Sequence, residues 1–431
     1  MKYYSTNNKN NSLTFREAIL QGLANDKGLF MPERIKPLSK NFISNVSQIN
    51  FQEISFEIAK NFVEDEIPEN DLKSIIENSI SFEAPLVSLN ENLSILELFH
   101  GPTLAFKDFG ARFMARTMEY FLKNSKNEIT ILVATSGDTG SAVANGFLNV
   151  EGINVVVLFP SGKISKIQEK QITTLDNNIT AIEVQGTFDD CQRLVKSAFI
   201  DEDLKSKINL SSANSINIGR LIPQSFYYFE SFKQIQNKNK DVVYSVPSGN
   251  LGNLTAGLFA KKMGLPISKF IAATNKNDVF TNFIYNGKFN PRTTVETLSN
   301  AMDVGDPSNF VRIIDLYNNH SIISEIIFSK SFNDQDTLKK MQELFDDKNY
   351  IIDPHGAVGC LALRDYQNKV NSDCMGIVLE TAHPAKFLNV FEDNLKFKPE
   401  IPERLSKCLN KKGSTIKISS EYKDFKEVLQ N

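Results

Sequence analysis

Residues 129–147 of the chain read ITILVATSGDTGSAVANGF, and the expected fold follows from this stretch. The apolar run at 129–135 is typical of a strand buried on both faces, and a helix is expected at 139–149 after a loop rich in Gly, Ser and Thr. Further strands of this kind are expected at 94–99, 153–159, 179–184, 241–246, 269–274 and 375–381. Helices are expected between them at 105–124, 164–175, 187–203 and 253–263. This alternation predicts an α/β fold with open, doubly wound, mostly parallel sheets.

The composition of the whole chain limits its class. The 431 residues are 41% hydrophobic and 23% charged, which is typical of a soluble globular protein with two or three domains. A net charge of −3 argues against nucleic acid or a membrane surface as the main partner. The polar N-terminus lacks the core of a signal peptide, and no apolar run is long enough to span a bilayer.

The four cysteines and four histidines are scattered along the chain, without a CxxC pair or the spacing of metal ligands. We therefore expect reduced thiols in a cytoplasmic protein and no metal site. Residues 1–82 are expected to be mostly helical, and they contain no Gly-rich loop.

Two loops at the carboxyl ends of expected strands are rich in small polar residues. The first is TSGDTGSA at 135–142, and the second is PSGNLGN at 247–253. Each opens a helix, so that free N–H groups and the helix dipole would attract an anion, and the glycines would let the backbone approach it. No lysine follows the glycines, which argues against a nucleoside triphosphate. One such loop alone is more often a tight turn, but two in one sheet indicate a ligand site.

Lys107 lies in HGPTLAFKDFG, near the first turn of the helix expected at 105–124. Taken alone, it would lay its stem on apolar surface and hold its amine in water. Here the helix dipole and the rings of Phe106 and Phe109 would favour the neutral, nucleophilic amine that a Schiff base requires. A nucleophilic lysine with two anion loops favours pyridoxal phosphate (PLP), which carries an aldehyde and a phosphate and whose substrates carry a carboxylate.

Five motifs occur in order along the chain: HGPTLAFKDFGARFMA, TSGDTGSA, NSINIGR, PSGNLGN and ETAHPAKF. Together they resemble the threonine synthase family, in its longer bacterial and fungal branch, over nearly the whole chain. The resemblance implies PLP fold type II, that of tryptophan synthase β, and a lyase that converts O-phospho-L-homoserine and water to L-threonine and phosphate. It implies an N-terminal segment at 1–82, a large PLP-binding domain at 83–106 and 221–395, a small domain at 107–220 and a C-terminal extension at 396–431. It leaves open whether the chain is a monomer or a homodimer.

The resemblance also implies roles for single residues, of which Lys107 would form the imine with PLP. The other cofactor contacts would come from Asp138, Gly249, Asn250, Leu251, Gly252, Asn253 and Thr381. Substrate contacts would come from Ser136, Gly137, Thr139, Lys163, Asn214, Ser215 and Arg220. Thr381 would face the pyridine nitrogen and leave it neutral, and Glu380 beside it should then point away. A bidentate Arg220 suits a phosphate, whereas Lys163 is equally a solvated loop lysine.

The roles of several residues, and the function itself, have more than one interpretation at this point. Asp108 either orients Lys107 or complements the helix N-terminus. His100 and His383 are expected to be packed loop histidines rather than bases, and His355 is expected to mark a strand-to-helix turn. Asp138 stands where relatives with SSGNT carry an Asn beside the cofactor's ring hydroxyl, so its contact is undecided. The alternatives are another fold-type II enzyme, such as a serine/threonine dehydratase or a cysteine synthase, and a non-catalytic regulator that binds a small molecule.

Overall fold

The computed structural model describes residues 1–10, 12–123, 125 and 128–430. Its larger sheet has six strands in the order β12-β11-β10-β13-β5-β4, and only the β4–β5 pair among these is antiparallel. The strands are β4 (Leu86–Asn90), β5 (Leu93–Glu97), β10 (Val242–Pro247), β11 (Lys269–Thr274), β12 (Ile327–Ser331) and β13 (Met375–Glu380). The predicted α/β fold with mostly parallel sheets is confirmed.

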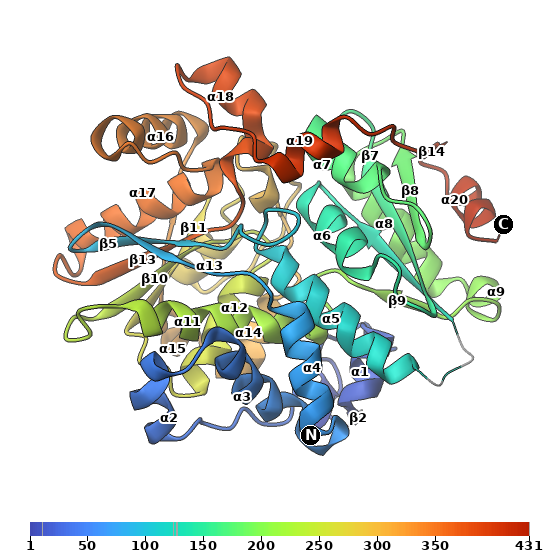
Figure 1. The fold of residues 1–431 in the computed structure, drawn as a ribbon, viewed down its shortest axis with the longest axis horizontal. Coiled ribbons are helices and arrows are strands. Elements are labelled where there is room, and N and C mark those ends of the chain that lie inside the picture. The colour runs from blue at the N-terminus through green and yellow to red at the C-terminus, as the bar shows by residue number, and fades with distance from the viewer. Residues whose placement is uncertain (11, 124, 126–127, 431) are drawn as a thin grey trace.

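A second sheet has five strands in the order β14-β8-β7-β6-β9, and every pair in it is parallel. The strands are β6 (Ile129–Ala134), β7 (Ile153–Pro160), β8 (Ile179–Val184), β9 (Leu210–Ser212) and β14 (Ile416–Ile418). The side chains of β7 are buried at seven of its eight positions, because helices cover both faces of the sheet. In Figure 1 this sheet lies on the right and the six-stranded sheet on the left.

The helices follow the predicted alternation with small shifts at their ends. Those that shape the site are α5 (Lys107–Leu122), α6 (Asp138–Phe147), α7 (Lys166–Thr173), α10 (Ile218–Leu221), α12 (Gly252–Lys262) and α17 (Pro354–Lys369). The helix expected at 187–203 is divided into α8 (Phe188–Ile200) and α9 (Glu202–Lys205), because Asp201 leaves the helical conformation and caps α9. Figure 1 shows α5 in the middle of the molecule, between the two sheets.

The N-terminal segment contains more than the predicted helices. Its first strands form an antiparallel sheet in the order β2-β1-β3, made of β1 (Lys2–Ser5), β2 (Ser12–Thr14) and β3 (Phe30–Pro32). Its helices are α1 (Phe15–Gln21), α2 (Lys40–Asn45), α3 (Phe51–Val63) and α4 (Glu69–Ser79). The hydroxyl of Tyr3 donates to the carbonyl of Phe62 at 2.7 Å, so that sheet and helices share one core.

The last part of the chain is attached to the five-stranded sheet. After β13 the chain forms the short 3-10 helix η5 (Pro384–Phe387) and α18 (Leu388–Asn394). Then α19 (Glu403–Leu409) packs on α7, β14 pairs with β8, and α20 (Tyr422–Gln430) packs on α8. No helix within the described residues is long and apolar enough to cross a membrane.

Phe109 belongs to the aromatic core beneath the N-terminal helices and not to the surroundings of Lys107. It is fully buried, and its ring contacts those of Phe51, Phe82 and Tyr227. The expectation that Phe109 desolvates the Lys107 amine is therefore wrong, because residues two apart on a helix point in different directions.

We expect Phe109→Ala to lower the free energy of unfolding by roughly 3–5 kcal/mol, because it leaves a cavity in this core. The urea unfolding midpoint of the full chain measures the loss. Ile200→Ala is the control, since Ile200 is 64% exposed and its truncation should leave the midpoint unchanged. An equal midpoint for the two variants would contradict the assigned packing.

Candidate active site at the carboxyl ends of the strands

Lys107 is the first residue of α5 and lies beside the end of β13. The preceding turn is attached there, since the N–H of Phe106 donates to the carbonyl of Thr381 at 2.8 Å and Ala105 pairs with Ala382. The side chain of Lys107 is half-buried, and its Nζ lies 5.9 Å from the centre of the Phe106 ring. Within the described residues, this amine has no hydrogen bond and no ion pair.

The surroundings of Lys107 favour its neutral form. The pKa of Lys107 is lowered to about 8, mainly by burial; the charge of Asp138 opposes this shift, and the charges of Lys386 and Arg220 add to it. The predicted neutral amine is therefore supported by a different set of neighbours than the helix dipole and two phenylalanines. A lysine with this pKa is half neutral at about pH 8, so that a fraction of the amine is neutral at physiological pH and can act as a nucleophile or a base.

The first anion loop, after β6, has the expected strand–loop–helix geometry. Gly137 has φ +132°, and a Cβ there would lie 2.3 Å from the side chain of Gln168, so only glycine fits. The hydroxyl of Thr135 accepts from the N–H groups of Gly137 and Gly140, at 2.9 and 2.8 Å. The hydroxyls of Ser136 and Thr139 have no partner in the described part of the chain, and both residues are half-buried. They are available to a ligand, together with the free N–H groups that begin α6.

The second anion loop, after β10, is held tightly against neighbouring backbone. A Cβ on Gly249 would lie 2.8 Å from the carbonyl oxygen of Ala301, and Leu251 has φ +60°, a strained conformation for this residue. The side chain of Asn253 donates to the carbonyl of Pro247 at 2.9 Å and closes the loop. Any contact of Asn253 with an anion would thus come from its backbone N–H. Gly252 and Asn253 begin α12, where N–H groups are free.

The two loops are joined through the NSINIGR segment. Nδ2 of Asn250 donates to the hydroxyl of Ser215 at 2.5 Å, and Nδ2 of Asn214 donates to the carbonyl of Ala134, at the end of β6, at 3.0 Å. The segment therefore spans from one sheet to the other, as expected for residues that share a ligand.

Arg220 is a buried cation without a carboxylate partner. It is 3% exposed, and its Nη1 donates to the carbonyl of Ala213 at 2.5 Å. Its Nε has no partner among the described residues. Burial lowers its pKa to about 10. Gly110 on α5 permits this position, since a Cβ there would lie 2.7 Å from the Arg220 carbonyl. An unpaired buried guanidinium is suited to a phosphate or carboxylate ligand.

Glu380, the last residue of β13, points toward the start of α17, and strand alternation predicts the opposite direction for Thr381. Glu380 is fully buried, and its Oε1 accepts from the N–H of Asp353 at 2.8 Å, at the start of α17. Burial, with the charges of Asp353 and Glu97, raises its pKa well above the usual range. The hydroxyl of Thr381, which is 6% exposed, has no partner within the described residues.

The sequence analysis assigned no role to three residues that the structure places beside Lys107: Lys386, Gln168 and Thr103. Lys386 is fully buried and forms an ion pair with Oδ1 of Asp138 at 2.7 Å. Nε2 of Gln168 donates to the same oxygen at 2.9 Å. Burial raises the pKa of Asp138, but Lys386 and then Lys107 lower it more, so this carboxyl is ionised. The motif ETAHPAKF was the only signal for Lys386.

Asp108 lies in the first turn of α5, which agrees with the expectation that it complements the helix N-terminus. Its carboxylate accepts from the N–H and the hydroxyl of Thr103, at 2.8 and 2.6 Å, and so closes the turn before Lys107.

Lys163 is 45% exposed, and its amine lies 3.8 Å from Oε1 of Glu296. No contact within the described ranges joins Lys163 to the other candidates.

The histidines behave as packed or capping residues. His383 accepts from the N–H of Ala385 at 3.1 Å, and burial lowers its pKa to about 4. His355 lies in the first turn of α17 and contacts Asp353 at 2.6 Å, as expected for a strand-to-helix turn. His100 contacts Oε2 of Glu97 at 2.8 Å.

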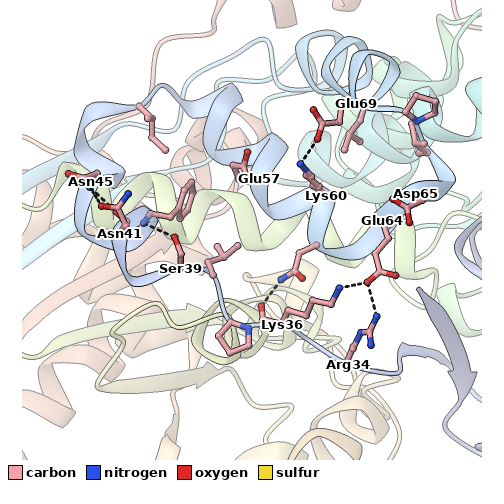
Figure 2. A pocket seen from close by; sticks show the side chains of 18 residues that line it. Arg34, Lys36, Ser39, Asn41, Asn45, Glu57, Lys60, Glu64, Asp65 and Glu69 are labelled. Carbon is pink, nitrogen blue, oxygen red and sulfur yellow. Dashed lines mark hydrogen bonds and ion pairs between the residues drawn. The ribbon is translucent and has the colours of Figure 1, made fainter.

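A groove of about 990 Å³ lies far from this site, in the N-terminal segment beside α2, α3 and α4 (Figure 2). Its charged side chains pair with one another: Glu64 with Lys36 at 2.5 Å and with Arg34 at 3.1 Å, and Lys60 with Glu69. The hydrogen bond to Glu69 raises the pKa of Lys60, which is the opposite of what a nucleophilic amine requires, and we do not assign the chemistry to this groove.

The residues around Lys107 fit PLP. The pKa of the amine is lowered, the loop at 247–253 ends at the free N–H groups that begin α12, and the Thr381 hydroxyl has no partner among the described residues. Three family profiles agree with this geometry: "Threonine synthase N terminus" matches residues 2–80, "Pyridoxal-phosphate dependent enzyme" matches 82–379, and "Threonine synthase, C-terminal" matches 356–429. The chain is also 41% identical to the threonine synthase of Escherichia coli over 432 residues, which covers 100% of both chains.

The chain belongs to the threonine synthase family. The crystal structure of the Escherichia coli threonine synthase superposes with a TM-score of 0.93 at 40% identity and covers 100% of both chains. A PLP-bound threonine synthase from Brucella melitensis gives a TM-score of 0.93 at 32% identity over 100% of this chain and 99% of its own. These matches confirm the predicted fold, the PLP dependence and the activity of a threonine synthase, and the chain acts on a small molecule.

Proposed function

We propose that the substrate is O-phospho-L-homoserine and that the products are L-threonine and phosphate. The observation that carries this proposal is the presence of three anion-binding elements around one reactive amine: the loop at 135–142, the loop at 247–253 and the guanidinium of Arg220. PLP and a simple amino acid would supply two anionic groups, the cofactor phosphate and the substrate carboxylate. A third element indicates a substrate with its own phosphate.

The elements divide between the sheets as follows. The N–H groups of Gly249, Asn250, Leu251, Gly252 and Asn253 would hold the PLP phosphate, and the Thr381 hydroxyl would face the ring nitrogen. Ser136, Gly137 and Thr139 would bind the substrate carboxylate. Asn214, Ser215 and Arg220 would bind the substrate phosphate. This supports a cofactor domain at 83–106 and 221–395 and a small substrate domain at 107–220, to whose sheet β14 of the 396–431 extension adds a strand.

PLP held by Lys107 would supply the electron sink for carbanions next to the substrate nitrogen. The amine of Lys107 would accept the proton from the α-carbon, release it to water, and then accept one from the β-carbon, because its pKa of about 8 suits transfer in both directions. Arg220 would stabilise the negative charge that grows on phosphate as its bond to the γ-carbon breaks. Lys107 would return a proton to the γ-carbon. The oxygen of water would then add at the β-carbon, and a proton would return to the α-carbon to give threonine.

The test is an assay of phosphate and threonine formation from O-phospho-L-homoserine, with and without added PLP. We expect equal amounts of both products and a yellow absorbance that is lost on borohydride reduction. Release of a 2-oxo acid from serine or threonine, without phosphate release, would favour a dehydratase instead. A colourless protein that takes up no PLP would favour the regulator. We place the reaction in the cytoplasm, which the four unpaired cysteines support.

A further inference from the structure

Lys386 is a lysine whose entire side chain is buried, 0% exposed, in η5 directly after β13. Its Nζ makes two contacts among the described residues, with Oδ1 of Asp138 at 2.7 Å and with the carbonyl of Thr103 at 2.9 Å. A buried ammonium is tolerated only when it is paired and hydrogen-bonded. The position of Lys386 is therefore specified by these two partners.

Both partners of Lys386 are fixed from other elements. Asp138 begins α6, and Nε2 of Gln168 on α7 donates to its Oδ1 at 2.9 Å. Thr103 lies in the turn before Lys107; its N–H and hydroxyl donate to Asp108, and its carbonyl also accepts from Gln171 at 3.0 Å. Lys386 thus joins the substrate loop of one sheet to the turn that carries Lys107.

Asp138 lies between two lysines. Its negative charge acts on Lys107 as well as on Lys386, and the positive charge of Arg220 also acts on Lys107. Arg220 and Lys386 in turn face the buried Asp108. An opposite charge favours the charged form of an amine. Without Lys386, the carboxylate would be neutralised by Lys107 alone, and Lys107 would be held as an ammonium.

We propose that Lys386 is a positioning residue whose ion pair with Asp138 holds this carboxylate away from Lys107 and keeps the Lys107 amine free to react. The inference rests on the proposed role of Lys107, and it adds a function for a residue outside the two anion loops. Lys386 touches neither substrate nor cofactor in this assignment. It acts through the charge and place of Asp138.

The direct test measures the reactivity of Lys107 in the cofactor-free protein. Brief acetylation at a series of pH values, followed by mass spectrometry of the Lys107 peptide, gives the pH at which this amine is half reactive. We expect about 8 for the wild type. In Lys386→Met this pH should rise by about one unit or more, and in Asp138→Asn it should fall. With PLP bound, the acid limb of the pH profile of kcat should move to higher pH in Lys386→Met.

The matched control is Lys240→Met. Lys240 also forms a pair with an aspartate, Asp373 at 2.6 Å, and is 18% exposed, but it lies before β10, at the opposite end of that strand. This variant should leave the half-reactive pH of Lys107 unchanged. If Lys386→Met does not fold, the double variant Asp138→Asn/Lys386→Met leaves no unpaired buried charge. Because Lys386 acts through Asp138, its loss should then have little effect, and the half-reactive pH of Lys107 should stay close to that of Asp138→Asn alone.

An unchanged half-reactive pH of Lys107 in folded Lys386→Met overturns the proposal, and so does a half-reactive pH in the double variant that lies about one unit or more above that of Asp138→Asn. Such a result would leave Lys386 with a purely structural role. Because the labelling uses no substrate and no cofactor, its outcome is independent of whether the wild type releases phosphate from O-phospho-L-homoserine. Failure of the inference and failure of the proposed function are thus distinguishable.

Discussion

Lys107→Ala is expected to abolish the visible absorbance of the purified protein and to lower kcat for threonine formation by about a thousandfold or more. The substitution removes the one amine that the structure leaves unpaired at this site. Lys386 cannot replace it, because its Nζ is held by Asp138 and the carbonyl of Thr103. The measurements are the spectrum of the protein with added PLP and the rate of phosphate release from O-phospho-L-homoserine.

Two controls separate lost chemistry from lost structure in Lys107→Ala. Lys240→Met should keep both the spectrum and the rate, since its ion pair lies before β10, away from the site. Added methylamine should restore part of the rate of Lys107→Ala, because a small amine can enter the space left by the side chain and accept the proton. Phosphate release near the wild-type rate without any amine would show that the role assigned to Lys107 is wrong.

The fold was predictable where the chain is buried on both faces. The run at β7, INVVVLFP, and the similar runs at β6, β10 and β13 are long and apolar because parallel sheets are covered by helices. The strands that the prediction missed lack this signal. They are β1 to β4, β9, β12 and β14. β9 and β14 have three residues each, and β4 and β12, at the two edges of the six-stranded sheet, are largely not buried, as is typical of edge strands. Pairing with distant segments, and not local pattern, makes them strands.

The position of the site was predictable for the same reason, since ligands bind at the carboxyl ends of parallel strands. The burial of single charged side chains was not predictable from the sequence. Lys386 stands in a short polar motif far along the chain from Asp138, and only the folded structure shows that the two meet. Phe109 shows the opposite error: its place beside Lys107 in the sequence suggested contact, but the helix turns it toward Phe82.

Arg220→Met is expected to lower kcat/KM for O-phospho-L-homoserine by about a hundredfold to a thousandfold, while PLP binding stays nearly intact. The physical reason is that Arg220 is buried and has no carboxylate to neutralise it, so its charge is available to the leaving phosphate. Steady-state kinetics give kcat and KM separately, and titration of the cofactor absorbance gives PLP affinity. A loss in both kcat and kcat/KM would indicate that Arg220 acts in the transition state.

Arg112→Met on α5 is the matched control for Arg220. The guanidinium of Arg112 also donates to carbonyl oxygens, those of Ser79 at 3.0 Å and Asn78 at 2.5 Å, but on the side of α5 that faces the N-terminal helices. Its loss should affect stability and leave KM unchanged. Arg220→Lys keeps the charge and removes the forked donor, so it should recover only part of the lost rate if the phosphate is bound bidentately. If Arg220→Met kept the wild-type kcat/KM, the substrate phosphate would have to be bound elsewhere, and the exposed Lys163 would become the next residue to substitute.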